Sequence, residues 1–192
     1  MASTIIPAAT AMHSRHVRAL LVYTSVHHQN TAKVAYEMAG VLGAECAAPG
    51  ECPYSRLANC DLLGIGSGIY YGRPHDELLQ WVHGLPDTLG RGLPVFIFTT
   101  SGLPFLATFW HRLLKHALAS RGFKLVGEFA CRGFDTWGPL WLTGGLNWRH
   151  PNERDFQRAR EFARGVQAAI LASPQAAPRH GLSPPGRLTA PR

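Results

Sequence analysis

Short runs of apolar and β-branched residues alternate with longer amphipathic segments along most of this chain, and this alternation limits the folds open to it. The apolar runs occupy residues 17–24, 43–47, 61–66, 93–99 and 124–131, and the amphipathic segments occupy residues 31–42, 75–83, 105–121 and 152–171. Strands that alternate with helices form a parallel sheet, because each helix returns the chain to the same end of the sheet. The sequence therefore predicts an α/β domain with a doubly wound, five-stranded parallel sheet and helices on both faces.

The length of the chain fits one such domain with a tail at each end. A chain of 192 residues, 46% of them hydrophobic, can bury one sizeable core. The predicted strands and helices span residues 17–171, which we expect to form the domain. Residues 1–16 and 172–192 have no apolar period and are rich in Ala, Pro and Arg, so we expect both to be disordered. Met12 is an alternative start, because the core pattern begins shortly after it.

The formal net charge of +7 does not indicate a nucleic-acid-binding protein. Residues 1–18 and 173–192 contain five arginines and no acidic residue, which leaves +2 for the rest of the chain. Tracking a nucleic-acid backbone requires clustered Lys and Arg, and no basic stripe with interleaved aromatics is present. We therefore expect no nucleic-acid partner.

The sequence does not indicate a membrane span or an exported protein. The most apolar region, residues 93–114, is broken by "TTSG" and by Pro104, and the N-terminus has no basic segment followed by an apolar run. Cys46, Cys52, Cys60 and Cys131 have neither metal-site nor Cys-x-x-Cys spacing, so we expect unreactive thiols in a reducing compartment. The sequence predicts a cytoplasmic protein.

A polar turn follows the first predicted strand. Residues 25–31, "SVHHQNT", link this strand to the first helix, and ligands of doubly wound sheets bind beside such turns. The N-terminus of the following helix favours an anion such as phosphate. The turn has no Gly-x-Gly-x-x-Gly or Gly-Lys-Ser motif, and a turn that only caps the helix is the alternative. His27 and His28 lack a third ligand at a suitable spacing, so no metal site is predicted.

Two further loops follow the third and fourth predicted strands. "GIGSGIYYGRPH" is rich in glycine and carries two tyrosines, and "TTSGLPF" begins with three hydroxyl side chains. Together with the polar turn, these loops describe a pocket for a flat ring that bears a phosphate.

These segments resemble the flavodoxin family of FMN-binding proteins. The resemblance covers residues 17–171 and rests on "YTSVHHQNTAKVA", "DLLGIGSGIYYGRPH", "VFIFTTSG" and "GFKLVGEFACRGFDTWGPL". The family's phosphate loop reads Thr/Ser-x-Thr-Gly-x-Thr. Ser25 and the pair Asn30 and Thr31 fit its ends, whereas residues 27–29 replace its centre and make it one residue longer. The resemblance implies the strand order 2-1-3-4-5 and noncovalent FMN.

The resemblance also implies which residues contact FMN. The phosphate would be held by the side chains of Ser25, His27, Asn30 and Thr31 and by the backbone N–H groups of His28 and Gln29. The ring would be lined on one side by Ser67, Gly68, Ile69, Tyr70 and Tyr71, and on the other by Thr99, Thr100, Ser101 and Gly102. Tyr70 is the expected stacking ring, with Tyr71 as the alternative. The loop after the fourth strand has no aromatic residue before Phe105, so one face of the flavin is expected to be open.

Two further segments have more than one interpretation. The helix at 105–121 could bind a membrane or a partner, but we expect an ordinary surface helix with its polar residues Arg112, Lys115 and Arg121 in solvent. Its buried face is predicted to consist of Phe109, Leu113, Leu114, Ala117 and Leu118. Residues 131–147 are unusually aromatic and either plug the sheet edge or fold over the flavin, with Phe134, Asp135 and Trp137 as the residues to mutate.

The resemblance implies a redox function. The protein would be an electron carrier, serving a redox partner protein or a small electron donor or acceptor, or an FMN-dependent NAD(P)H/quinone-type oxidoreductase. No nucleophile triad is visible as a local pattern, so no catalytic residue is assigned. The rival is a non-redox module that binds another phosphate ligand or a protein on the same fold. The sequence does not specify the oligomeric state.

Overall fold

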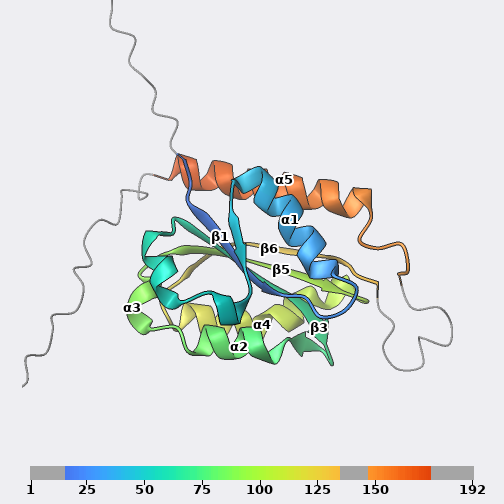
Figure 1. Ribbon diagram of the computed structural model, residues 1–192, viewed down its shortest axis with the longest axis horizontal. Coiled ribbons are helices and arrows are strands. Elements are labelled where there is room, and N and C mark those ends of the chain that lie inside the picture. The colour runs from blue at the N-terminus through green and yellow to red at the C-terminus, as the bar shows by residue number, and fades with distance from the viewer. Residues whose placement is uncertain (1–15, 135–146, 174–192) are drawn as a thin grey trace, which may run out of the picture.

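The computed structural model describes residues 16–134 and 147–173. In these residues, five parallel strands form one sheet in the order β2-β1-β3-β5-β6 (Figure 1). The strands are β1 (Ala19–Thr24), β2 (Glu45–Ala47), β3 (Leu62–Tyr70), β5 (Pro94–Ser101) and β6 (Lys124–Arg132). This arrangement confirms the predicted fold class and strand order. The sequence did not predict β4 (Arg73–Pro74), which pairs antiparallel with the end of β3.

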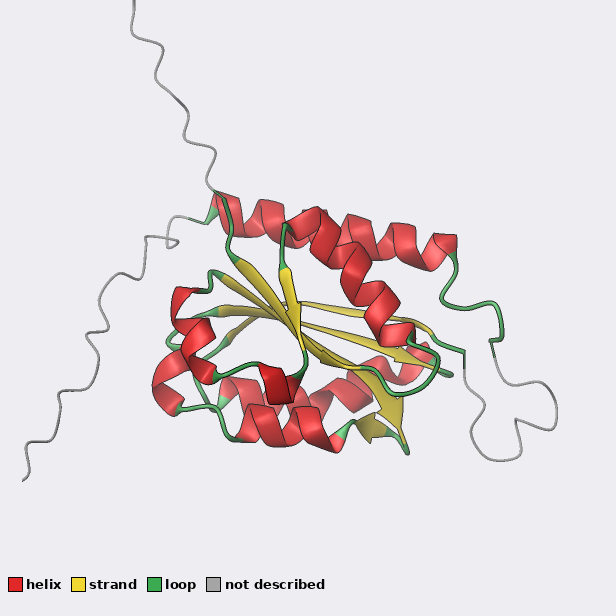
Figure 2. Ribbon diagram, viewed as in Figure 1, coloured by secondary structure: helices red, strands yellow, loops and turns green. Residues whose placement is uncertain are grey.

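Helices cover both faces of the sheet (Figure 2). One face packs against α1 (Asn30–Leu42) and α5 (Glu153–Ala172), and the other packs against α2 (Asp76–His83) and α4 (Ala107–Ala119). The shorter helices are α3 (Asp87–Gly90), η1 (Pro49–Glu51), η2 (Tyr54–Asn59) and η3 (Pro104–Leu106). No helix of these described ranges has the length and apolar character needed to cross a membrane.

The alternation of side chains along β5 divides the core into two layers. Phe96 and Phe98 pack on the α1 and α5 side, whereas Val95 and Ile97 pack on the α2 and α4 side. Successive side chains of a strand point to opposite faces, so a fully buried strand is apolar throughout. On the neighbouring strand, a Cβ atom at Gly66 would meet the Phe98 ring at 2.1 Å. The glycines of β3 therefore make room for the phenylalanines of β5.

Helix α4 is rotated relative to the prediction. Leu114, Ala117 and Leu118 are buried as expected, but Phe109 and Leu113 are exposed, and the prediction for these two residues was wrong. Their place on the buried face is taken by Trp110 and His111. The predicted buried face consisted of apolar residues alone, whereas His111 is buried with hydrogen bonds at both ring nitrogens.

The solvent exposure of the polar residues in this helical segment also differs from the prediction. Arg112 is exposed as expected, but Lys115 and Arg121 are only partly exposed. Lys115 Nζ donates to Glu128 Oε1, and Arg121 donates to the carbonyl of Leu85 at the end of α2. Lys115 therefore joins α4 to β6, and Arg121 joins the end of α4 to the segment that follows α2.

Several expectations lie outside the described residues. The proposed tails at 1–16 and 172–192, with Met12, fall almost entirely beyond them, as do Asp135 and Trp137 of the aromatic loop. Of that loop, the structure describes residues 131–134 and Asn147, and the role of the loop as a whole stays a prediction.

Candidate functional site

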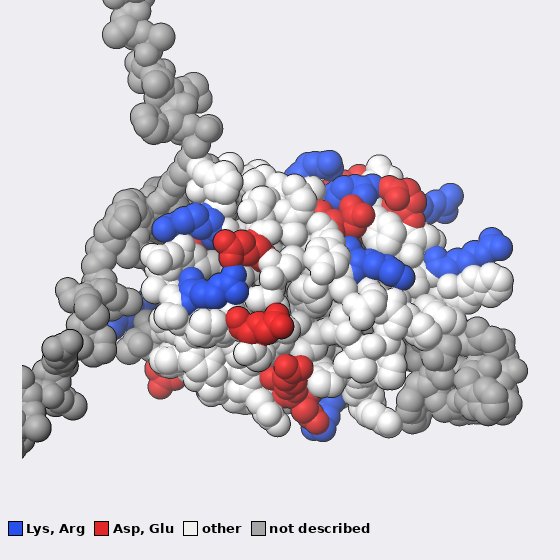
Figure 3. All heavy atoms as spheres, viewed as in Figure 1, with Lys and Arg blue, Asp and Glu red and all other residues white. Residues whose placement is uncertain are grey.

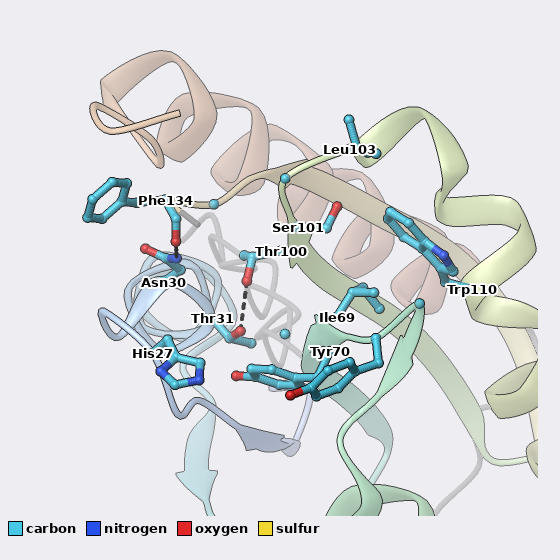
Figure 4. A pocket seen from close by; sticks show the side chains of 15 residues that line it. His27, Asn30, Thr31, Ile69, Tyr70, Thr100, Ser101, Leu103, Trp110 and Phe134 are labelled. Atoms are coloured by element: carbon cyan, nitrogen blue, oxygen red, sulfur yellow. Dashed lines mark hydrogen bonds between the residues drawn. The ribbon is translucent and has the colours of Figure 1, made fainter. Parts of the chain in front are cut away.

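A cavity of about 470 Å³ lies at the carboxyl end of the sheet (Figure 4). Its walls come from the start of α1, the ends of β3 and β5, the first turn of α4 and the residues that follow β6. The strand order reverses here, because the chain continues from β1 to β2 on one side of the sheet and from β3 to β5 on the other. Ligands of doubly wound sheets bind at such a point. The volume lies within the range of small-ligand pockets.

The polar turn shapes one end of the cavity. His28 and Gln29 both have φ of 55°, in the left-handed region, and they lead directly into α1 at Asn30. Ser25 Oγ accepts the N–H of Ala32 at 3.2 Å. The first turn of α1 contains no acidic residue, so no side-chain charge there offsets the positive end of the helix dipole. The side chains of His27, Asn30 and Thr31 line this end of the cavity.

Two hydrogen bonds fix α1 to the opposite wall. Thr31 Oγ1 and Thr100 Oγ1 lie 2.9 Å apart, and Asn30 Nδ2 donates to the carbonyl of Phe134 at 2.8 Å (Figure 4). The Phe134 ring also packs against His28, with 4.3 Å between the ring centroids. The turn, β5 and the end of β6 are thereby joined around the cavity.

The two tyrosines after β3 occupy different positions. The Tyr70 hydroxyl accepts the N–H of Val26 at 3.1 Å, and its ring lies between His27 and His75, with centroid distances of 5.7 and 5.4 Å. Tyr71 is 82% exposed and has φ of 51°. Both residues line the cavity, Tyr70 as a wall that is tied to the polar turn and Tyr71 at the mouth.

The sequence-predicted residues separate into two groups. Those that line the cavity are His27, Asn30, Thr31, Gly68, Ile69, Tyr70, Tyr71, Thr100, Ser101 and Gly102. Ser25, His28, Gln29, Ser67 and Thr99 do not belong to its lining. Ser25 and Gln29 line a second cavity of about 350 Å³ beside β1 and β2. The structure therefore brings the first group together around one cavity. The residues of the second group lie behind the wall of this cavity or beside it.

Strand alternation explains why Ser67 and Thr99 point away. The two residues are paired in register, as are their neighbours Gly68 and Thr100, so each pair points to one face of the sheet. Ser67 Oγ accepts the N–H of His75 at 2.9 Å, and Thr99 Oγ1 lies 2.8 Å from His111 Nε2. Both hydroxyls therefore bind the α2 and α4 layer rather than the cavity.

Ser101 is a buried hydroxyl that lacks a hydrogen-bond partner among the described residues. Its residue is 7% exposed, and its Oγ is the buried side-chain nitrogen or oxygen for which no hydrogen bond is found among residues 16–134 and 147–173. Ser101 lies on the cavity wall between Thr100 and Trp110 (Figure 4). An unsatisfied buried polar group costs about 1–3 kcal/mol. A polar atom of a ligand in the cavity would remove this cost.

Several lining residues were not assigned to the site from the sequence, namely Gly72, Leu103, Trp110, Gly133 and Phe134. Sequence reasoning considered only the residues directly after each strand, whereas Trp110 reaches the cavity from within α4. The correct helical phase of α4, with His111 buried, would have identified it. For Phe134 the sequence predicted only membership of an aromatic loop that either plugs the sheet edge or folds over the flavin.

A hydrogen-bonded chain lies behind the cavity. His111 Nε2 contacts Thr99 Oγ1, His111 Nδ1 lies 2.7 Å from Glu128 Oε2, and Lys115 Nζ lies 3.0 Å from Glu128 Oε1. Burial lowers the pKa of His111, although Glu128 opposes this effect. Burial alone would raise the pKa of Glu128, but the hydrogen bonds from His111 and Lys115 together lower it. At neutral pH an ionised Glu128 can only accept, so Nδ1 of a neutral His111 carries the proton and Thr99 donates to Nε2.

The cysteines take no part in the cavity. All four are free, and Cys52, Cys60 and Cys131 are buried. Burial raises the pKa of Cys60 and of Cys131 to about 12 each, which makes them poor nucleophiles. Within the described part of the chain, no group of three His, Cys, Asp or Glu residues is placed to hold a metal ion.

Sequence comparison relates this chain to an uncharacterized protein. No family model matches the chain. The chain is 40% identical over 150 residues to the uncharacterized protein MJ0298 of Methanocaldococcus jannaschii, in an alignment that covers 78% of this chain and 98% of that protein. This identity and coverage indicate a common family.

Structure comparison identifies the fold. A flavodoxin from the domain Archaea superimposes with a TM-score of 0.60 at 12% identity and covers 81% of this chain and 99% of its own. A flavodoxin of Streptococcus pneumonia TIGR4 gives 0.60 at 16% identity over 80% of this chain and 99% of its own. A flavodoxin, WrbA-like protein from Agrobacterium tumefaciens gives 0.59 at 17% identity over 81% of this chain and 98% of its own. At these identities the fold is shared, and the chemistry of the cavity must be argued from its own residues.

Proposed function

We propose that this chain, which belongs to one family with protein MJ0298 and has a flavodoxin-like fold, is a redox protein that binds FMN noncovalently in the 470 Å³ cavity. The observation that carries the proposal is the combination of two unlike ends in one cavity. One end is the N-terminus of α1 with polar side chains, and the other is a largely apolar slot with the unpartnered Ser101 hydroxyl. FMN has the same division, with a phosphate at one end and a flat ring at the other.

The phosphate would lie at the polar turn. The dipole of the 13-residue helix α1 favours an anion there, and its first turn contains no carboxylate that would compete. In this proposal His27, Asn30 and Thr31 hold the phosphate with their side chains, since they line the cavity. Ser25, His28 and Gln29 contribute through the conformation and the backbone N–H groups of the turn.

The ring would lie between the ends of β3 and β5. Gly68, Ile69, Tyr70 and Tyr71 line one side, and Thr100, Ser101 and Gly102 line the other, with Trp110 and Leu103 beyond them. In this proposal Ser101 Oγ hydrogen-bonds to the polar edge of the ring. Ser67 and Thr99 support the two walls from behind through their bonds to the α2 and α4 layer.

Bound FMN supplies one- and two-electron transfer, and the residues of this chain bind it, orient its ring and exclude water from the buried side. The leading form of the proposal is an electron-transfer protein. An FMN-dependent NAD(P)H/quinone-type oxidoreductase is the second candidate. It is supported by a further cavity of about 250 Å³ that shares His27, Tyr70 and Tyr71 with the first and would give room to a second reactant. The proposal places the protein in the reducing cytoplasm, in keeping with its free thiols.

The test is an absorption spectrum of the purified protein before and after incubation with excess FMN and removal of free ligand. We expect a bound flavin spectrum, and tighter binding of FMN than of riboflavin because riboflavin lacks the phosphate. A protein that remains colourless after reconstitution refutes the proposal and favours a different phosphate ligand or a protein-binding module. Steady-state turnover with NAD(P)H and a quinone would distinguish the oxidoreductase from the carrier.

Ser101→Ala tests the ring end of the cavity. We expect several-fold weaker FMN binding, as for the loss of one hydrogen bond worth about 1 kcal/mol. The free energy of unfolding without FMN should stay equal or rise, because the variant removes an unsatisfied buried hydroxyl. Ser120→Ala at the far end of α4 is the matched control and should leave FMN binding unchanged.

A further inference from the structure

Large apolar side chains are exposed along one border of the cavity. Leu103 lines the cavity itself, and the exposed side chains continue along η3 and the outer face of α4. Phe105 is 77% exposed and Phe109 is 63% exposed. We call this the mouth patch, and its residues are Leu103, Phe105, Leu106, Phe109 and Leu113. Contiguous exposed apolar surface beside a pocket is typical of a binding site.

A second segment adds to the same border. Asn147 Nδ2 donates to the carbonyl of Gly102 at 2.9 Å, which holds the segment that begins at Asn147 against the end of β5. The next residue, Trp148, is 67% exposed. Trp148 therefore follows directly on a residue that is hydrogen-bonded to Gly102, the neighbour of Leu103 in the mouth patch.

Two arginines contact the exposed aromatic residues of this border. The Arg112 guanidinium lies 5.9 Å from the centre of the Phe109 ring, and the Arg149 guanidinium lies 5.4 Å from that of Trp148. Neither arginine forms an ion pair with a carboxylate of residues 16–134 or 147–173. The sequence has no Asp or Glu between Asp87 and Glu128, and Glu128 is bound to His111 and Lys115.

The rest of the surface provides a contrast. Over α1 and α5, acidic and basic side chains are interspersed (Figure 3), and Arg160 of α5, for example, is paired with Glu37 of α1. The border of the cavity instead combines aromatic residues with arginines and lacks acids on η3 and α4. Aromatic residues and Arg are the types that are enriched where proteins bind one another.

We propose that the mouth patch, with Arg112, Trp148 and Arg149, is the docking surface for an electron-transfer protein with an acidic surface. This inference rests on the proposed FMN function. Charge complementarity indicates the occupant, because acidic groups of a partner would pair with arginines that form no ion pair within residues 16–134 and 147–173. A second copy of this chain would bring the same arginines face to face across a symmetric interface, which like charges oppose.

Docking here would cover the mouth of the cavity, so that electrons need only cross the interface. In each encounter one electron would pass from the reduced flavin to the oxidised metal centre of the partner. Two encounters would return a fully reduced flavin to its oxidised form, and the two protons that it carried would pass to water. The apolar side chains provide the contact, and the arginines determine the approach.

The experiment measures electron transfer from the FMN-reconstituted, reduced protein by stopped flow. The acceptors are an acidic blue-copper protein, whose Cu(II) is reduced to Cu(I), and a basic cytochrome c, whose Fe(III) is reduced to Fe(II). At low ionic strength we expect a second-order rate constant at least about tenfold higher with the acidic acceptor. This preference should shrink as salt is added, because salt screens the attraction. An equal rate, or a preference for cytochrome c, would overturn the inference.

Substitutions test separately how the arginine charges and the apolar contact contribute to the rate of electron transfer. Arg112→Glu combined with Arg149→Glu should lower the rate with the acidic acceptor and raise it with cytochrome c. Phe109→Ser should lower the rate with the acidic acceptor and leave FMN binding unchanged, since Phe109 does not line the cavity. Arg164→Glu, an exposed arginine on α5 across the sheet, is the matched control and should change neither rate. A control that behaves like the double variant would contradict a localised docking surface.

Two further measurements distinguish other occupants. Co-sedimentation with phosphatidylglycerol vesicles that Phe109→Ser abolishes would identify a membrane surface and overturn the inference. A dimer in analytical ultracentrifugation that dissociates in Phe109→Ser would identify a second copy and do the same. The FMN spectrum is read first: a protein without flavin refutes the proposed function and with it this inference, whereas a flavoprotein without charge preference refutes this inference alone.

Discussion

The Oγ1 atoms of Thr31 and Thr100 lie 2.9 Å apart, although the two residues are 69 positions apart in the sequence. Thr31 stands in the first turn of α1 and Thr100 near the end of β5, and both are buried. Both also line the cavity. This hydrogen bond, together with the one from Asn30 Nδ2 to the Phe134 carbonyl, thus fixes the distance between the polar turn and the opposite wall.

Replacing Thr31 by Val is expected to destabilise the protein by about 1–3 kcal/mol, because the hydroxyl of Thr100 would remain buried without its partner. Urea-induced unfolding of the protein without FMN measures this loss. In the double variant Thr31→Val and Thr100→Val most of the stability should return, since neither polar group is left unpaired. Strictly additive losses would contradict this account of the pair.

The chain from Thr99 through His111 to Glu128 predicts loss of stability in acid. Folding lowers the pKa of His111, so as pH falls below 6.5 the unfolded chain binds a proton that the folded protein does not, and the free energy of unfolding decreases. Folding also lowers the pKa of Glu128, so its contribution is present above pH 4.5 and is lost as pH falls through its folded pKa. Urea unfolding at a series of pH values measures both effects.

His111→Gln identifies the source of the first effect. The variant should be less stable at neutral pH, and its stability should change less with pH just below 6.5 than that of the parent protein. His116→Gln is the matched control, because His116 is exposed on the same helix and should leave the pH profile unchanged. Identical pH profiles for the parent protein and His111→Gln would refute the assignment.

Gly68→Ala is expected to damage the cavity. A Cβ atom at this position would lie 2.6 Å from the Tyr70 hydroxyl, which accepts the N–H of Val26. The Tyr70 ring must move, and the strain should cost about 1–3 kcal/mol of stability. We expect FMN affinity to fall by about tenfold, equivalent to about 1.4 kcal/mol, in a fluorescence titration.

Gly165→Ala is the control for this substitution. Gly165 lies within α5, and a Cβ atom there has no neighbour within 4 Å. This variant should gain up to about 1 kcal/mol of stability, because Ala favours a helix interior over Gly. Equal effects of the two alanine variants would show that the close approach of Tyr70 has no energetic consequence.

The N-terminus of α5 gives a further prediction. Asn152 Oδ1 accepts the N–H groups of Arg154 and Asp155, and Asp155 Oδ2 accepts the N–H of Asn152. Asn152→Ala should cost about 1 kcal/mol, whereas Asn152→Ser should cost much less because Ser is also a good helix cap. Thermal or urea unfolding would detect the difference, and equal losses in both variants would argue against the cap.

The sequence was sufficient to predict the arrangement of strands and helices. Strand and helix periods are local properties of the chain, so the parallel strands and the principal helices could be predicted from where apolar residues recur. The strand order was predicted only from the resemblance to flavodoxins. The start of the last helix at residue 152 was predicted for a similar reason, because a helix start depends on a few adjacent residues. The polar turn at 25–31 was located for the same reason.

The side-chain arrangement of the cavity required the tertiary structure. Thr99 and Thr100 are adjacent and chemically alike, yet one binds His111 behind the wall and the other lines the cavity with Thr31. Which face of α4 is buried depends on His111, and the burial of His111 is stabilised by its hydrogen bond to Glu128 of β6. The sequence alone thus determined the strands, helices and turns, which follow from local periodicity. Only the tertiary structure decided which side chains meet, because burial and hydrogen bonding depend on partners that are distant in the chain.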